Sequence, residues 1–216
     1  MLDLLFSQPQ LFIVVLLAII IALSFHEFSH AFVAFKLGDN TAQSLGRLTV
    51  NPLAHIDWIG LLVMVTVGFG WAKPVPFNPH NLKYKKWGPT MVAFAGPLSN
   101  LLLALISAGL FWLFAFTLGM PADNALLIFL GFSLIVNLAL MFFNFIPLPP
   151  LDGSKLLLAF LDKPKYAQLR YRIETQGFWI LLGLLIADSF LGINVFGKMF
   201  SLVMSIANAM LGGALL

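Results

Sequence analysis

The chain has 216 residues, of which 60% are hydrophobic and only 10% are charged, and its formal net charge is +3. Soluble globular domains carry about 25% charged residues, so this chain cannot cover itself with polar surface and a soluble enzyme is excluded. Intrinsic disorder requires low hydrophobicity and high net charge, and is also excluded. The composition predicts a polytopic membrane protein. Cysteine is absent, which excludes disulfides, thiolate metal sites and cysteine nucleophiles.

Several apolar runs are long enough to cross a bilayer, because a spanning helix needs about 20 residues. We expect membrane spans at about 10–36, 89–119, 124–145 and 177–190. The stretch at about 195–215 is either a fifth span or a helix lying on the surface, because Lys198, Gly212 and Gly213 interrupt it. The sequence therefore predicts one domain, 1–216, with an all-α fold. It consists of a three-span core followed by one or two C-terminal helices.

The segment at about 44–76, after the first span, differs from the spans in composition. Apolar, partly β-branched runs at 45–50 and 59–69 alternate with glycines and prolines that favour turns. We expect short strands or a re-entrant element, with an edge that pairs with an unwound substrate backbone as an added strand. Non-helical backbone at membrane depth must be buried in protein or line a wet cavity, so this segment indicates a water-accessible pocket.

Basic residues gather in two of the connecting segments. Six lysines and arginines lie between Lys36 and Lys86, and five lie between Lys155 and Arg172, whereas the turn after the second span carries only Asp123. By the positive-inside rule both basic segments are cytoplasmic and the N-terminus is outside. The net charge of +3 is small and the basic residues lie in short loops. They therefore indicate the orientation of the chain in the membrane rather than a nucleic-acid-binding surface, and we expect no nucleic-acid partner.

The most informative motif is His26-Glu27-Phe28-Ser29-His30, late in the first span. On a helix, His26 and His30 project from one face, one turn apart, where they can bind one Zn²⁺ while Glu27 acts as general base. Ionisable residues inside a transmembrane helix are costly and are functional by default. The alternative is a polar helix-contact patch satisfied by neighbouring backbone.

A catalytic zinc takes three protein ligands and leaves one position for water. We favour Asp152 as the third ligand, since it follows the third span at the depth of the histidines, where prolines break the helix. Glu174 and His55 are rivals, although a salt bridge is the simpler role for the first and a loop hydrogen bond for the second. His80, between Pro79 and Asn81, is typical of a turn.

An oxyanion formed during peptide hydrolysis needs a hydrogen-bond donor beyond the metal. Asn137 and Asn144 both lie on the third span and each offers an amide N–H. An interhelical hydrogen bond is the alternative role, which is common for asparagine in membranes. We favour Asn144 as the donor because it is closer to Asp152.

Together these motifs resemble the site-2 protease family of intramembrane zinc metalloproteases. That family pairs a His-Glu-x-x-His motif in its first core span with Leu-Asp-Gly in the third, which stands here at 151–153. The blocks at 46–57, 70–76 and 95–100 are similar to its short bacterial and archaeal branch, so the resemblance covers about 26–155.

The resemblance implies a function and a site. It implies that His26, His30 and Asp152 bind one zinc ion per chain, that Glu27 is the catalytic acid and base, and that Asn144 lies beside the metal. The implied substrates are transmembrane segments of other proteins, cleaved in the bilayer toward the cytoplasmic side. We expect a multi-pass protein of a prokaryotic cell membrane, without room for a PDZ or CBS domain, and the sequence leaves its oligomeric state open.

Two other classes of function stay open at this point. A membrane zinc protease of the CAAX-processing type would take its third ligand from a later helix, here Glu174. A metal transporter or metal-binding membrane protein would need polar groups along a continuous path, whereas the ionisable groups gather at one depth. An inactive relative acting as a scaffold is a further alternative.

Overall fold

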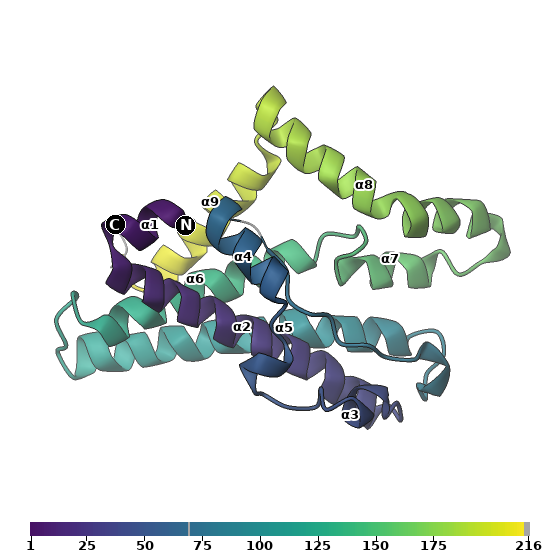
Figure 1. The fold of residues 1–216 in the computed structure, drawn as a ribbon, viewed down its shortest axis with the longest axis horizontal. Helices are drawn as coiled ribbons and strands as arrows, with labels where there is room; N and C mark the ends of the chain where they lie inside the picture. Colours follow the sequence, from purple (N-terminus) through teal and green to yellow (C-terminus); the bar gives the residue numbers. More distant parts are fainter. Residues whose placement is uncertain (69, 214–216) are drawn as a thin grey trace.

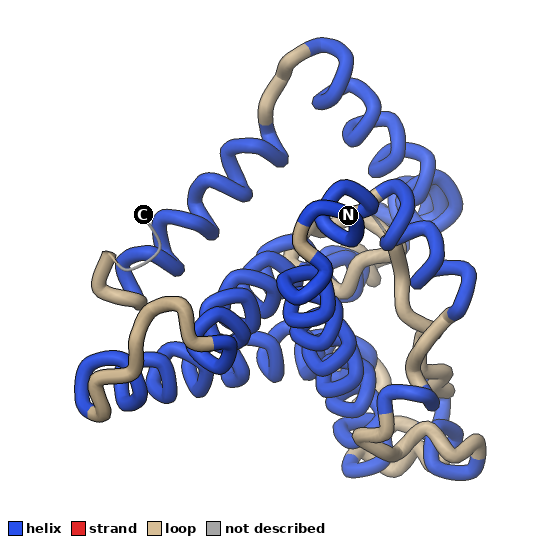
Figure 2. The backbone as a smooth tube through the Cα atoms, turned by 60° about the vertical axis from the view of Figure 1, so that its left-hand side comes forward, coloured by secondary structure: helices blue, strands red, loops and turns tan. Residues whose placement is uncertain are grey.

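The computed structural model describes residues 1–68 and 70–213. Within these residues the regular structure consists of helices joined by loops and contains no strand, as Figure 2 shows. The helices, labelled in Figure 1, are α1 (Leu2–Ser7), α2 (Pro9–Lys36), α3 (Thr41–Ser44), α4 (Trp58–Val67), α5 (Gly88–Trp112), α6 (Ala125–Asn144), α7 (Gly153–Phe160), α8 (Ala167–Leu191) and α9 (Val195–Met210). A π-helical turn, Leu113–Thr117, continues α5.

Three helices in the described part of the chain are long and apolar enough to cross a membrane. They are Pro9–Lys36, Gly88–Thr117 and Ala125–Asn144. This confirms the all-α membrane fold and its three-span core. Helix α8 begins well before the expected fourth span, and α9 is a shorter apolar helix. Both C-terminal spans stay predictions, and the end of the fifth, 214–215, lies outside the described residues.

The core lies where α5, α6 and α9 meet. Ala104, Ala108 and Phe111 of α5 pack against a row of leucines on α6, and Val203 and Ala207 of α9 close the cluster. On its other side the bundle is completed by α2, which packs against both α5 and α6. Small buried residues permit this close approach, which is the usual basis of helix packing in membranes.

The segment at 44–76 contains no strand in its described residues, 44–68 and 70–76, so the expectation of short strands was wrong. The alternative of a re-entrant element, and the pairing of this segment with a substrate backbone, stay predictions. Its second apolar run forms α4 instead, because Asp57 caps the helix by accepting hydrogen bonds from the N–H groups of Ile59 and Gly60. Gly68, with φ of 89°, ends the helix in the left-handed conformation that glycine adopts readily. The non-helical residues 70–77 lie between α4 and the turn at Pro79–Asn81, and we call them the strap.

Asp39 fixes the turn that follows α2. It is fully buried, and its carboxylate accepts hydrogen bonds from Thr41, from the Asn78 backbone and from the Asn81 side chain. Burial raises the pKa of this carboxyl, but the hydrogen bonds outweigh burial and the net effect lowers the pKa. The loop beyond the strap is therefore attached to the end of α2, the helix that carries the histidine pair.

Candidate metal centre

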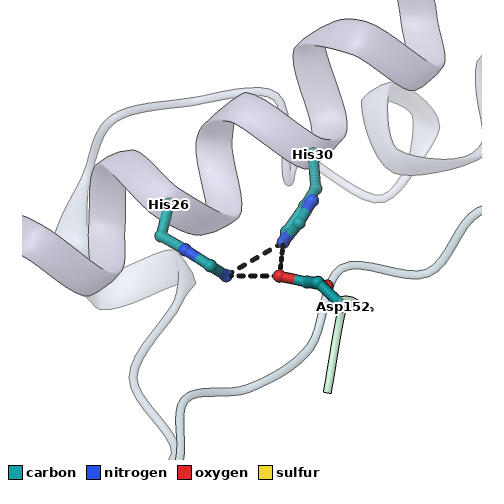
Figure 3. A group of neighbouring side chains, drawn as sticks. All are labelled: His26, His30 and Asp152. Carbon is teal, nitrogen blue, oxygen red and sulfur yellow. Dashed lines mark hydrogen bonds and ion pairs between the residues drawn. The ribbon is translucent and has the colours of Figure 1, made fainter. Parts of the chain in front are cut away.

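His26 and His30 of α2 meet Asp152, which stands at the start of α7 (Figure 3). The Nε2 atoms of the two histidines lie 3.0 Å apart, and Asp152 Oδ2 lies 3.2 Å from His26 Nε2 and 3.4 Å from His30 Nε2. Asp152 precedes α7 without using its side chain as a helix cap. Two elements that are far apart in sequence therefore bring three potential ligand atoms together.

The other ring nitrogens decide the tautomers of the two histidines. His30 Nδ1 lies 2.8 Å from the Val92 carbonyl oxygen, and His26 Nδ1 lies 2.6 Å from Asn100 Oδ1. Both oxygens can only accept, so each Nδ1 carries the proton and each Nε2 presents a lone pair. Three electron-rich atoms thus face one another in a buried place.

These donors fit a zinc ion. Tetrahedral zinc with bonds of 2.0–2.1 Å places its ligand atoms about 3.3 Å apart, close to the three separations found here. Asp152 Oδ2 is buried without a hydrogen-bond partner, as expected of an atom reserved for a cation.

Two residues of α5 shape this centre, Gly96 and Asn100, which lie in the block 95–100 but were given no role in the site by the sequence. Asn100, which is fully buried, accepts from His26 and donates to Asn137 Oδ1 at 2.8 Å and to the Ala22 carbonyl at 3.3 Å. Gly96 faces the imidazoles so closely that a β-carbon would lie 2.5 Å from His30 Nε2 and 2.5 Å from His26 Cε1. Asn100 is a polar residue within the apolar second span, and that position was the signal in the sequence that could have indicated a functional role.

A cavity of about 510 Å³ adjoins the three donors. Glu27 also lines it, and its Oε2 accepts a hydrogen bond of 3.0 Å from the Val75 N–H of the strap. Asn144 lines the same cavity, with its amide nitrogen 3.0 Å from the Leu140 carbonyl one turn earlier. The structure therefore gathers all five of the favoured site residues around one cavity.

The rival residues lie elsewhere. Glu174 pairs with Arg170 at 3.0 Å on α8, and His55 Nε2 bonds the Thr49 carbonyl at 2.7 Å. His80 lies in the turn at Pro79–Asn81 as expected. Asn137 has the interhelical role that was the alternative reading, through its hydrogen bond with Asn100. Among the described residues, the His26, His30 and Asp152 group is the one arrangement of at least three such side chains suited to a metal ion.

Comparison with known proteins extends these findings. Residues 114–187 match the model of Peptidase family M50, a range that includes Asn144 and Asp152. No solved structure matches the chain significantly.

Three relatives cover most of the chain. It is 36% identical over 179 residues to "Putative zinc metalloprotease YwhC" of Bacillus subtilis, which covers 79% of this chain and 78% of that protein. It is 32% identical over 195 residues to "Putative zinc metalloprotease Rip2" of Mycolicibacterium smegmatis, with 85% and 70% covered. It is 31% identical over 157 residues to "Putative zinc metalloprotease MJ0611" of Methanocaldococcus jannaschii, with 70% and 75% covered. The donor group of His26, His30 and Asp152 lies between apolar helices, as expected of a membrane metalloprotease. Together with these matches it shows that the chain belongs to peptidase family M50, the site-2 proteases, and is a zinc metalloendopeptidase of the membrane.

Proposed function

We propose that this enzyme hydrolyses peptide bonds within or near the transmembrane segments of other membrane proteins, with its zinc held by His26, His30 and Asp152. The observation that carries the proposal is the depth of the donors in an apolar helix. Helix α2 ends at Lys36, so at 1.5 Å per residue His30 lies about 9 Å and His26 about 15 Å from its end. A site this far inside a spanning helix is within reach of a substrate that is itself in the bilayer.

The walls of the cavity support an apolar substrate. Apart from the site residues, the lining is dominated by aliphatic and aromatic side chains from α2, α5, α6, α8 and the strap. Four of them come from one face of α8, namely Phe178, Leu181, Leu182 and Leu185. Such a lining favours an apolar peptide segment over a polar chain, because burial of apolar surface is the main source of binding free energy.

The chemistry follows from the residues around the cavity. When bound, zinc lowers the pKa of a coordinated water to about 7 and polarises a peptide carbonyl. Glu27 takes the proton from the attacking water and later transfers it to the leaving amine. The Val75 N–H holds one carboxylate oxygen of Glu27, which fixes the orientation of the group toward the cavity.

Asn144 assists as a hydrogen-bond donor to the developing oxyanion. Its amide nitrogen carries two hydrogens, and the contact with the Leu140 carbonyl uses one of them. The second is available to the substrate carbonyl. A donor of this kind contributes about 10²- to 10³-fold to kcat in other hydrolases.

The orientation forms part of the proposal. The distribution of basic residues supports an N-terminus outside and a site toward the cytoplasm, and we propose a prokaryotic cell membrane as its location. The His30 end of α2 leads directly into the first of these basic segments. The site is therefore reached most directly from the cytoplasmic side.

The test uses the full chain reconstituted in lipid vesicles, with a panel of single-span apolar peptides carrying a fluorophore and a quencher. Wild type is expected to cleave at least one peptide, and Glu27→Gln to lose that cleavage by about 10²-fold or more while keeping its zinc. Glu174→Gln, the same change outside the cavity, is the matched control and should retain activity. Full activity in Glu27→Gln, or cleavage of soluble casein in preference to every spanning peptide, would overturn the proposal.

A further inference from the structure

Arg47, in the loop between α3 and α4, is a buried cation without an anionic partner. Arg47 is only 7% exposed. Within the described residues no carboxylate lies within ion-pair distance of its guanidinium. Its Nε is buried without a hydrogen-bond partner. Burying a charge in this way is costly, so a purely structural position would be filled more favourably by an apolar side chain.

The guanidinium of Arg47 reaches the strap. Its Nη2 donates a hydrogen bond of 2.5 Å to the backbone carbonyl of Lys73. The same nitrogen lies 3.5 Å from His55 Nδ1. Because His55 Nε2 contacts the Thr49 carbonyl, Nε2 carries the ring proton and Nδ1 presents its lone pair to the arginine.

Lys73 is held from its other side as well. Its backbone N–H donates to the backbone carbonyl of His55 at 2.9 Å. Both hydrogen-bonding groups of this peptide segment are therefore fixed by the 47–55 loop. The strap has no helix or strand hydrogen bonds of its own, so these two contacts at Lys73 fix its position.

That position is two residues from the contact with Glu27. Pro74 and Pro76 flank Val75, and each proline fixes its own φ near −65°. Little rotational freedom remains between the Lys73 carbonyl and the Val75 N–H that binds Glu27 Oε2. A displacement of Lys73 is therefore transmitted to the carboxylate.

We propose that Arg47 is a positioning residue for catalysis, which acts through Lys73 and the strap to orient the Glu27 carboxylate. This inference rests on the proposed function, since it takes Glu27 to be the general base. Arg47 contacts neither the candidate ligands nor the cavity, so its removal should leave zinc binding intact. Misplacing a reacting group by about 1 Å costs about 10²-fold in rate, and that sets the size of the expected effect.

The experiment compares Arg47→Met, which keeps the length of the side chain without its donors, with Arg47→Lys, which keeps one donor and the charge. Arg172→Met, on the exposed surface of α8, is the matched control. The probe is a single-span peptide that wild type cleaves in vesicles. Zinc content, kcat, KM and hydrogen–deuterium exchange over 70–77 are measured for each variant.

We expect Arg47→Met to lower kcat by about 10- to 100-fold, with KM changed less than about twofold, full zinc and faster exchange over the strap. Arg47→Lys should recover part of kcat, and Arg172→Met should match wild type. Wild-type kcat in Arg47→Met overturns the inference, as does a loss of zinc in step with kcat, which would indicate a general structural role. If Arg47→Met does not fold, Arg47→Lys decides by the same criteria.

The two proposals fail in different ways. Activity in Glu27→Gln would refute the assignment of the general base, whatever the Arg47 variants do. An inactive Glu27→Gln together with a fully active Arg47→Met would refute only the role of Arg47.

Discussion

Gly96 makes a sharp prediction, because it packs directly against the two imidazoles. In Gly96→Ala the new β-carbon would lie 2.5 Å from His30 Nε2, 2.5 Å from His26 Cε1 and 2.6 Å from His26 Nε2. Ordinary contacts begin at 3.4 Å, so one partner must move by about 0.9 Å. Helix α5 cannot retreat easily, since it is bonded to His26 through Asn100 and packs against α2 and α6. The imidazoles must therefore move.

The required movement is large on the scale of a metal site. Ligand distances in zinc sites vary by about 0.2 Å, so a shift of about 0.9 Å exceeds that tolerance roughly fourfold. Removal of a group that only hydrogen-bonds to a metal ligand weakens metal binding by about 10- to 100-fold. In Gly96→Ala two of the ligands themselves are displaced. We expect Gly96→Ala to bind zinc at least about 100-fold more weakly, which corresponds to about 2.7 kcal/mol.

Zinc affinity is measured by competition with a chelator, and folding by thermal unfolding in the metal-free state. Gly109→Ala is the matched control, because it lies on the same helix and its β-carbon would meet no atom within 4 Å. Its zinc affinity should equal that of wild type, and its helix should be slightly favoured by the higher propensity of alanine. Wild-type zinc affinity in Gly96→Ala would refute the assignment of the ligand set.

Three further predictions concern the ligands, their supports and the end of α2. Asp152→Asn should lose bound zinc as determined by elemental analysis, whereas Glu174→Gln should retain it; the reverse result would transfer the third ligand to α8. Asn100→Leu leaves the His26 Nδ1–H buried without an acceptor, so its zinc affinity should fall about 10- to 100-fold, and an unchanged affinity would contradict this support. Asp39→Asn should lower the free energy of unfolding by about 1–3 kcal/mol near pH 6, as determined by denaturant titration. Because hydrogen bonds lower the folded-state pKa of Asp39, its contribution is present above the unfolded value of about 3.9 and is lost as the pH falls below it. The difference from wild type should therefore shrink on acidification, and a constant difference would contradict this reasoning.

The three-span core could be predicted closely from the sequence. The expected spans 10–36 and 124–145 correspond to helices Pro9–Lys36 and Ala125–Asn144. Lipid offers no hydrogen-bond partners, so a long apolar run must satisfy its own backbone as a helix. Composition alone therefore determines both the type and the approximate length of these elements.

The same reasoning failed between the spans, where the backbone has other partners. The β-branched run after Asp57 indicated a strand, but Trp58–Val67 is a helix. The decisive signals were local, namely a capping aspartate at the start and a glycine at the end, at Gly68. Ten residues of apolar sequence fit either type of element by periodicity, so the caps should have outweighed composition.

The candidate site was predictable only in part. The spacing of His26 and His30 indicates a shared helix face, and the turn at Asp152 offered a third donor. Neither Gly96 nor Asn100 could be assigned in that way, because their roles depend on how α5 is rotated and shifted against α2. Sequence periodicity identifies the face of a helix but does not specify its register against a neighbour.

Helix α6 shows why that register matters to the chemistry. Its Asn137 and Asn144 are seven residues apart, or about 10 Å along the axis at 1.5 Å per residue. Asn137 supports the Asn100 side chain that bonds His26, whereas Asn144 faces the cavity beside Asp152. A shift of α6 by one residue would disturb the support of a proposed ligand and the proposed oxyanion donor together. The pentapeptide of α2 supplies two imidazoles and a carboxylate, but their alignment for hydrolysis depends on the packing of all three spans.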